Sequence, residues 1–132
     1  MPEKYPIVDL ENKKAGALIV HCSDNRFQEA YRFVVDEIGQ RFDPIVLPGA
    51  SKAVVENETV MPYIELLHGF HSFEEVHILD HVECGAYGPV DDELKAHTEV
   101  LKASKAKILG SLPNLAIHGY LLREDHYQTV EL

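Results

Sequence analysis

The stretch AGALIVHC, residues 15–22, decides the fold class of this chain. It is continuously apolar from Ala15 to Val20. A strand buried on both faces has this pattern, whereas a strand with one exposed face alternates apolar and polar residues. The polar stretch SDNRF, residues 23–27, follows directly. The predicted strand therefore ends in a thiol, a carboxylate and a guanidinium that lie within five residues of one another.

Helical and strand patterns alternate along the rest of the chain. A helix that ends at Gly39 is predicted by the apolar residues Phe27, Tyr31, Val34, Val35 and Ile38. Further strands are predicted at 43–49, 74–81, 114–122 and 127–132. Further helices are predicted from Val60 to Gly69 and over 91–109. In the second of these helices, Leu94, Leu101 and Ile108 lie on one apolar stripe, which should face the core. We therefore expect one α/β domain, residues 1–132. Its mostly parallel central sheet of four to five strands should carry helices on both faces.

Length and charge exclude several classes of protein. The 132 residues suit one domain, and the formal net charge of −10 disfavours nucleic acid and anionic membranes as partners, because phosphate binding needs clustered Lys and Arg. The longest apolar run is too short to cross a bilayer, and the first residues show no signal-peptide pattern. We therefore expect a cytoplasmic protein. Its two cysteines could form a disulfide, but in a reducing compartment spaced Cys and His are more often ligands or nucleophiles.

Three candidate metal ligands follow two predicted strands. Cys22 ends the first strand, and His81 and Cys84 follow the strand at 74–81. The carboxyl ends of parallel strands meet at one edge of a sheet, where function gathers. Two thiolates and one imidazole suit tetrahedral zinc, and three protein ligands leave a fourth position for water, as in catalytic sites. The sequence therefore predicts Zn²⁺ as the cofactor.

Asp24 and Arg26 stand next to the first of these ligands. A guanidinium can bind one edge of a carboxylate and leave an oxygen free to accept a hydrogen bond from metal-bound water. Taken singly, Cys22 could be a small buried side chain, and the other two an Asx-turn and a surface ion pair. Their occurrence together, with His81 and Cys84 at neighbouring strand ends, favours an active site.

The motifs CSDNR, residues 22–26, and HVECG, residues 81–85, resemble those of the β-class carbonic anhydrases. The order of elements, the segment LPGAS at 47–51 and the strand IHGYLL at 117–122 are also similar, so that the likeness covers about residues 16 to 123. The resemblance implies that Cys22, His81 and Cys84 are the zinc ligands. It also implies that Asp24 and Arg26 form the catalytic dyad.

The activity implied by the resemblance is the reversible hydration of carbon dioxide to bicarbonate, by a zinc-bound hydroxide that the dyad orients. Backbone at Gly49, Ala50, Gly85 and Ala86 is expected to line the substrate cleft. Hydrolysis of carbonyl sulfide or carbon disulfide, known in some relatives, would suit the same site. An alternative from another class is a non-catalytic zinc-binding regulatory protein, in which Asp24 is the fourth ligand and closes the site.

The chain departs from the family pattern at several places. Asn25 stands where many members have serine, and LPGASKA replaces a segment that resembles Arg-Asn-Ala-Gly-Asn. No glutamine precedes Cys22, and only 21 residues come before it, so the family's N-terminal helical arm is largely absent. The sequence thus predicts a short member of the family with an intact set of metal ligands.

Two other uses of Cys22 fit the sequence less well. A tyrosine-phosphatase loop, Cys-x5-Arg, needs arginine at position 28, where this chain has Gln28. A cysteine hydrolase that pairs Cys22 with His81 leaves Cys84 unexplained. Most of six further histidines are expected to be ordinary surface or half-buried residues, and one of them could pass protons to solvent: His68, His71, His77, His97, His118 and His126.

Phe33 lies off the apolar stripe of its predicted helix. An exposed aromatic side chain of this kind is typical of a surface that a partner covers. Because members of the family that the chain resembles form dimers with the active site near the subunit interface, we expect a homodimer or a dimer of dimers.

Overall fold

The computed structural model describes all residues of the chain, Met1–Leu132. A five-stranded sheet in the order β2-β1-β3-β4-β5 forms its centre, and only the β4–β5 pair is antiparallel. The strands are β1 (Ala17–His21), β2 (Phe42–Val46), β3 (Glu75–His81), β4 (Ala116–Leu122) and β5 (Tyr127–Val130). The α/β fold class predicted from the sequence is confirmed.

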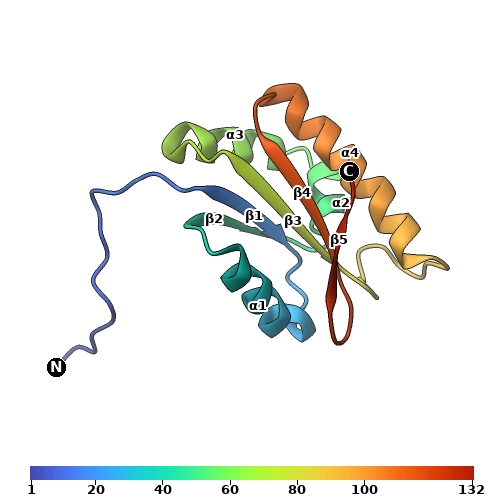
Figure 1. The fold of residues 1–132 in the computed structure, drawn as a ribbon, viewed down its shortest axis with the longest axis horizontal. Helices are drawn as coiled ribbons and strands as arrows, with labels where there is room; N and C mark the ends of the chain where they lie inside the picture. Colours follow the sequence, from blue (N-terminus) through green and yellow to red (C-terminus); the bar gives the residue numbers. More distant parts are fainter.

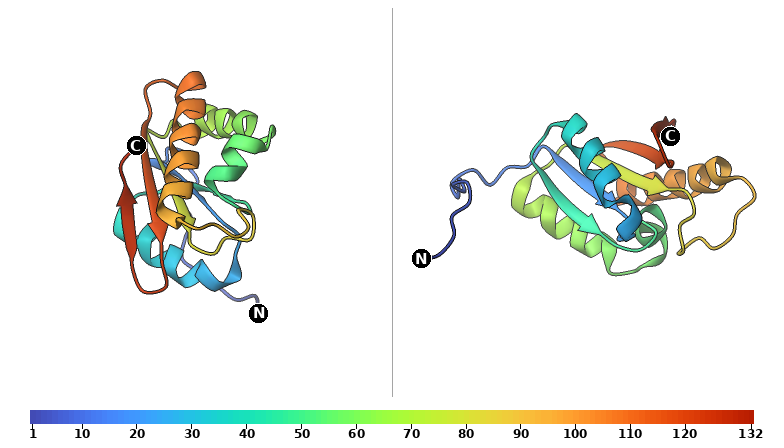
Figure 2. Two further views of the ribbon diagram at one scale, coloured as in Figure 1. Left: turned by 90° about the vertical axis from the view of Figure 1, so that its right-hand side faces the viewer. Right: turned by 90° about the horizontal axis from the view of Figure 1, so that it is seen from below.

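Helices cover both faces of the sheet (Figure 1). They are η1 (Asn25–Phe27), α1 (Gln28–Ile38), α2 (Ser51–Glu56), α3 (Val60–His71) and α4 (Glu93–Ser111). The connection through α1 runs toward one edge of the sheet, whereas the connections through α2, α3 and α4 run toward the other. Since parallel crossovers are right-handed, α1 lies on one face and the other three helices on the opposite face, as Figure 2 shows.

The core forms around β1 and β3. Residues 17–20 of β1 have no exposed area, and β3 is buried from Val76 to His81. Such burial on both faces is what the continuous apolar run of the sequence predicts. The two strands pair in parallel, with His21 opposite Leu79, so their carboxyl ends lie side by side.

The segment between β2 and β3 differs from the prediction. Strand β2 ends at Val46, and a short helix, α2, begins at Ser51 where none was predicted. Its six residues are too few to show a helical period in the sequence. Helix α3 also continues past Gly69 to His71, where Ser72 adopts φ 54° and donates its N–H to the His68 carbonyl.

Asp92 caps the start of helix α4, where its side chain accepts a hydrogen bond from the Lys95 backbone N–H. Leu101 and Ile108 face the core as predicted. The prediction for Leu94 is wrong, because 38% of its surface is exposed. The buried stripe instead includes two polar residues, His97 and Ser104, at the three- and four-residue spacing of one helix face.

Residues 1–14 run as an exposed extended segment away from the sheet (Figure 1). None of the helices combines the length and the apolar character that crossing a membrane requires.

Candidate metal centre

The predicted ligands Cys22, His81 and Cys84 come together at the carboxyl ends of β1 and β3. All three are buried, with exposed fractions of 4%, 1% and 4%. Their candidate ligand atoms lie within 4.8 Å of one another, and the two sulfur atoms are 4.0 Å apart. The pairing of the two strands brings together residues that are about sixty positions apart in the sequence.

The imidazole of His81 is oriented by its surroundings. Its Nδ1 lies 2.6 Å from the Val82 carbonyl oxygen, and its ring stacks on Phe27 with centroids 4.3 Å apart. With the proton on Nδ1, the ring donates to that carbonyl and its Nε2 carries a free lone pair. Burial lowers the pKa of His81, which favours this neutral form. Nε2 is buried and has no hydrogen-bond partner.

The donor set fits zinc. A buried polar atom without a partner is rare in proteins, and here it faces two thiols. Burial raises the pKa of the Cys84 thiol to about 11, so a cation is needed to hold it as the thiolate that metals bind. Cys22 Sγ accepts a hydrogen bond from the Gly49 backbone N–H at 3.4 Å.

Asp24 and Arg26 form a close ion pair beside the three ligands. Arg26 Nη2 lies 2.7 Å from Asp24 Oδ2, and Arg26 Nε lies 3.1 Å and 3.2 Å from the two carboxylate oxygens. The Arg26 backbone N–H donates to Oδ1 at 2.9 Å, and its Nη2 also donates to the Glu83 carbonyl at 2.9 Å. The guanidinium is thus fixed between the carboxylate and the loop that carries Cys84.

These contacts decide the charge of Asp24. Hydrogen bonds from Arg26, first from its side chain and then from its backbone, lower the pKa of Asp24 to about 2. The carboxylate is therefore ionised at neutral pH. Its Oδ2 lies 3.8 Å from His81 Nε2, which places this oxygen close to the atoms that would bind a metal.

Unusual backbone conformations surround the cluster. Gly49 has φ 87°, and a Cβ atom at this position would meet the Ala86 Cβ at 3.0 Å, so this position needs glycine. Ala50 and Glu83 also have positive φ, 43° and 53°. Backbone strain of this kind is common at functional sites.

The four predicted cleft residues differ in exposure. Gly49 and Ala50 are buried behind Cys22, whereas Gly85 and Ala86 are exposed on the loop that follows Cys84. The role of all four in binding a substrate stays a prediction.

A buried polar network, which the sequence did not predict, lies on the other face of β3. Asp80 accepts hydrogen bonds from the Ser51 backbone N–H at 3.0 Å and from the Tyr87 hydroxyl at 3.0 Å. It also accepts from the Ser51 hydroxyl at 2.5 Å and lies 2.7 Å from His97 Nδ1. The ring of Tyr87 packs on that of His97, with centroids 4.0 Å apart. The network connects β3, the start of α2, α4 and the loop after Cys84.

His97 is an exception to the expectation that most of the other histidines are ordinary surface or half-buried residues, because it has no exposed area. The spacing of positions 97, 101, 104 and 108 on one helix face was the available signal. His77 is buried as well, with 6% exposed.

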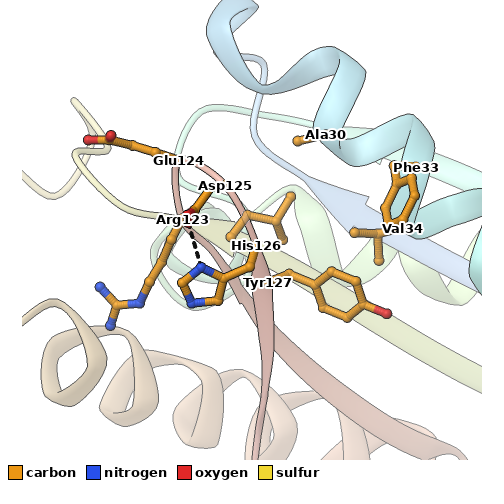
Figure 3. Close-up of a pocket in the computed structure, with 9 residues that line it drawn as sticks. Ala30, Phe33, Val34, Arg123, Glu124, Asp125, His126 and Tyr127 are labelled. Carbon is orange, nitrogen blue, oxygen red and sulfur yellow. Dashed lines mark hydrogen bonds and ion pairs between the residues drawn. The ribbon is translucent and has the colours of Figure 1, made fainter.

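A shallow hollow of about 270 Å³ lies between α1 and the β4–β5 hairpin. Figure 3 shows Phe33 and Val34 projecting from α1 on one side of it, with Tyr127 and His126 on the other. Phe33 is 60% exposed, as its position off the apolar stripe predicts. The hollow contains none of the candidate metal ligands.

Comparison with known proteins identifies relatives of this chain. An uncharacterized protein of Rickettsia bellii is 30% identical, over an alignment that covers 85% of this chain and 79% of the relative. An uncharacterized protein of Rickettsia conorii is 28% identical, with 85% and 69% covered. The chain belongs to the same family as the Rickettsia bellii protein. No family model matches the chain.

Solved structures of β-carbonic anhydrases share the fold. Carbonic anhydrase from Streptococcus mutans superposes with a TM-score of 0.70 and 15% identity, covering 96% of this chain and 88% of that one. β-Carbonic anhydrase from Trichomonas vaginalis gives 0.67 and 18%, covering 95% and 87%. The chain therefore has the β-carbonic anhydrase fold, which confirms the fold that the resemblance implied.

Proposed function

We propose that this chain is a zinc enzyme that interconverts carbon dioxide and bicarbonate. The observation that carries the proposal is the buried, partnerless Nε2 of His81 beside two thiols, with an ionised carboxylate 3.8 Å away. The β-carbonic anhydrase fold supports the same assignment.

Cys22, His81 and Cys84 would hold the ion. They supply two sulfur atoms and one nitrogen, a common ligand set for zinc, and leave one coordination position for a ligand from solvent. When bound in such a site, zinc lowers the pKa of a water ligand to about 7 and so supplies a nucleophile at neutral pH.

Asp24 would orient the nucleophile. A carboxylate offers about four lone pairs, and Arg26 makes four contacts with them: its backbone N–H and Nε donate to Oδ1, and Nη2 and, at 3.2 Å, Nε donate to Oδ2. Nε shares its single N–H between the two oxygens. Oδ2, which lies 3.8 Å from His81 Nε2, would therefore accept from a donor at the metal position in place of the longer Nε contact. Because the pKa of Asp24 is about 2, the group acts as an acceptor, not as an acid, throughout the neutral range.

Arg26 would keep Asp24 from closing the site. Its guanidinium holds the carboxylate through Nε and Nη2 and is itself held by the Glu83 carbonyl. Movement of Asp24 onto the ion would break these hydrogen bonds. The alternative, a closed non-catalytic site with Asp24 as fourth ligand, would need that movement.

The test measures carbon dioxide hydration by stopped flow with the zinc-loaded protein. We expect turnover well above the uncatalysed rate for the wild type and for the matched control Asn25→Ala, which changes the residue between the two dyad members. Asp24→Asn should retain zinc and lose hydration activity. A zinc-loaded wild type with no turnover, and zinc affinity that falls in Asp24→Asn, would instead support the closed site. Turnover of carbonyl sulfide or carbon disulfide without hydration of carbon dioxide would reassign the substrate.

We also propose that the chain forms a homodimer or a dimer of dimers. Phe33 is 60% exposed and lies beside an apolar hollow, which supports the proposal that a second subunit covers this surface. Light scattering should give a dimer or tetramer for the wild type and a smaller species for Phe33→Glu. Leu66→Glu, at a residue 51% exposed on α3, is the matched control. Only monomer for the wild type at micromolar concentration would refute the proposal.

A further inference from the structure

A second group of metal-ligating side chains lies at the amino-terminal end of β3. Glu75 and His77 come from β3, and His118 from the paired position of β4. Alternate residues of a strand share one face, so Glu75 and His77 lie on the same face of β3 as His81. His77, the member nearest along β3, is four residues from His81, which at the rise of a strand is about 13 Å. The group is therefore separate from the cysteine cluster.

The three side chains have the spacing that a metal ion requires. Their candidate ligand atoms lie within 4.8 Å of one another. His77 Nε2 is 3.3 Å from Glu75 Oε2, and His118 Nε2 is 4.0 Å from Glu75 Oε1. Two ligands bound at about 2.0–2.1 Å around a tetrahedral ion lie about 3.3 Å apart. The first pair already has this separation. The exposed His118 side chain can move to shorten the 4.0 Å distance of the second pair to the same value.

Neighbouring groups orient the ligands from behind. His77 Nδ1 lies 2.6 Å from the Tyr120 hydroxyl, and Nε2 lies 3.3 Å from Glu75 Oε2. A metal bound at Nε2 would replace the hydrogen bond to Glu75, and the proton would then sit on Nδ1, which can donate to the Tyr120 hydroxyl. The Gln40 side-chain amide donates to Glu75 Oε2 at 2.5 Å. Metal ligands in proteins are commonly fixed by such outer hydrogen bonds.

The group is open to solvent on one side. The side chain of His118 is 45% exposed, which leaves solvent access to the remaining coordination positions.

We propose that Glu75, His77 and His118 form a second metal site, for a divalent transition-metal ion such as Zn²⁺, Co²⁺ or Ni²⁺. Two imidazoles and one carboxylate favour these ions over Mg²⁺ and Ca²⁺, which prefer oxygen ligands. Positions not filled by the protein would take water or a small anion. The site contains no sulfur, so its spectroscopic signature differs from that of the cysteine cluster.

The test is a titration of the metal-free protein with Co²⁺, with bound ions counted by equilibrium dialysis. Wild type should bind two ions per chain, of which only one produces a thiolate-to-cobalt charge-transfer band. His118→Ala and Glu75→Gln should each bind one ion and keep the full band. His126→Ala, which removes an exposed histidine that pairs with Asp125, is the matched control and should still bind two.

The double variant Cys22→Ser/Cys84→Ser isolates the proposed site. It should bind one ion without the charge-transfer band, whatever the cysteine cluster does in the wild type. Failure of the double variant to bind cobalt would overturn the proposal, as would an unchanged count of two ions in both His118→Ala and Glu75→Gln. Either result would leave Glu75 as the ion-pair partner of two stacked histidines, His77 and His118, whose ring centroids are 4.7 Å apart.

Discussion

Asp80 and His81 are neighbours in β3, but their side chains point to opposite faces of the sheet and differ in the hydrogen-bond partners that the protein gives them. Asp80 lies against four donor groups, from Ser51, Tyr87 and His97. The Nε2 atom of His81 is equally buried and has no partner. The Asp80 side also contains a buried nitrogen without a hydrogen bond, His97 Nε2, but this atom lies 3.2 Å from the Glu93 carboxylate. His81 Nε2 lies 3.8 Å from Asp24 Oδ2, so the two sides differ in how closely a carboxylate approaches the unpaired nitrogen.

This difference separates structural support from a binding site. A fully satisfied buried network rigidifies a fold, whereas a partly satisfied one is costly unless a ligand completes it. The Asp80 network fixes the loop after Cys84 through Tyr87, and the cysteine cluster uses that loop. We therefore expect changes on the two sides to affect different quantities: metal binding and activity on one, folding stability on the other.

The Cys84→Ser variant should have the largest effect. Removing one of three ligands should abolish the thiolate-to-cobalt band and reduce hydration to the uncatalysed rate. The affinity of the cluster for zinc should fall by more than ~10²-fold, since changes to outer partners of zinc ligands already cost 10–100-fold. Ser23→Ala, at an exposed residue next to Cys22, is the control. A Cys84→Ser protein that keeps wild-type hydration would exclude the cluster as the active site.

The Arg26→Ala variant should have the next largest effect. Loss of the guanidinium frees Asp24 to move onto the ion, so zinc should remain bound while hydration falls by ~10²-fold or more, the scale of positioned acid–base assistance. Stopped-flow hydration together with zinc analysis measures both quantities. Hydration unchanged in Arg26→Ala and in Asp24→Asn would remove the dyad from the mechanism.

His97→Ala tests the other side of the strand. The variant leaves the buried Asp80 without one of its partners, and we expect a loss of about 3 kcal/mol in the free energy of unfolding. Tyr87→Phe, which removes only a hydroxyl donor, should cost about 1 kcal/mol. Urea unfolding of the zinc-loaded proteins measures both. Wild-type stability combined with loss of zinc would place the network within the metal site.

The smallest expected effect is a change in the pKa of Asp24 in the Arg26→Ala variant. In the folded protein it is about 2, below the ordinary 3.8, so the carboxylate stabilises the fold above pH 3.8 and this contribution disappears as the pH falls through about 2. In Arg26→Ala the pKa should rise toward 3.8, because the hydrogen bonds from Arg26 are the largest cause of the shift. An NMR titration of the Asp24 carboxyl carbon in metal-free protein checks this. An unchanged pKa would mean that other groups hold the charge.

The sequence predicted what depends on local pattern. The apolar run at 15–22 and its alternation with helical segments were enough for the parallel sheet. Chain order then placed Cys22 and His81 at neighbouring strand ends, because βαβ connections leave few alternatives. The same reasoning predicted that Cys84 lies beside Cys22 and His81, where the structure has it.

The sequence did not predict what depends on contacts between distant elements. His97 is fully buried because Asp80, 17 residues earlier, supplies its partner, and nothing near His97 in the chain indicates that contact. Leu94 was placed by its seven-residue spacing on the stripe of Leu101 and Ile108, but it lies in the first turn of α4, where 38% of its surface is exposed. Helix α2 was missed because its six residues are too few to show a helical period in the sequence.

The most direct test of whether Cys22, His81 and Cys84 form the metal site is X-ray absorption at the zinc edge. The sample is wild-type protein loaded with one equivalent of zinc. We predict two sulfur ligands at about 2.3 Å, one imidazole nitrogen at about 2.0–2.1 Å and one further light-atom ligand. The sulfur count should stay at two in Asp24→Asn and His97→Ala. A zinc ion with one sulfur ligand or none would contradict the assignment of Cys22, His81 and Cys84.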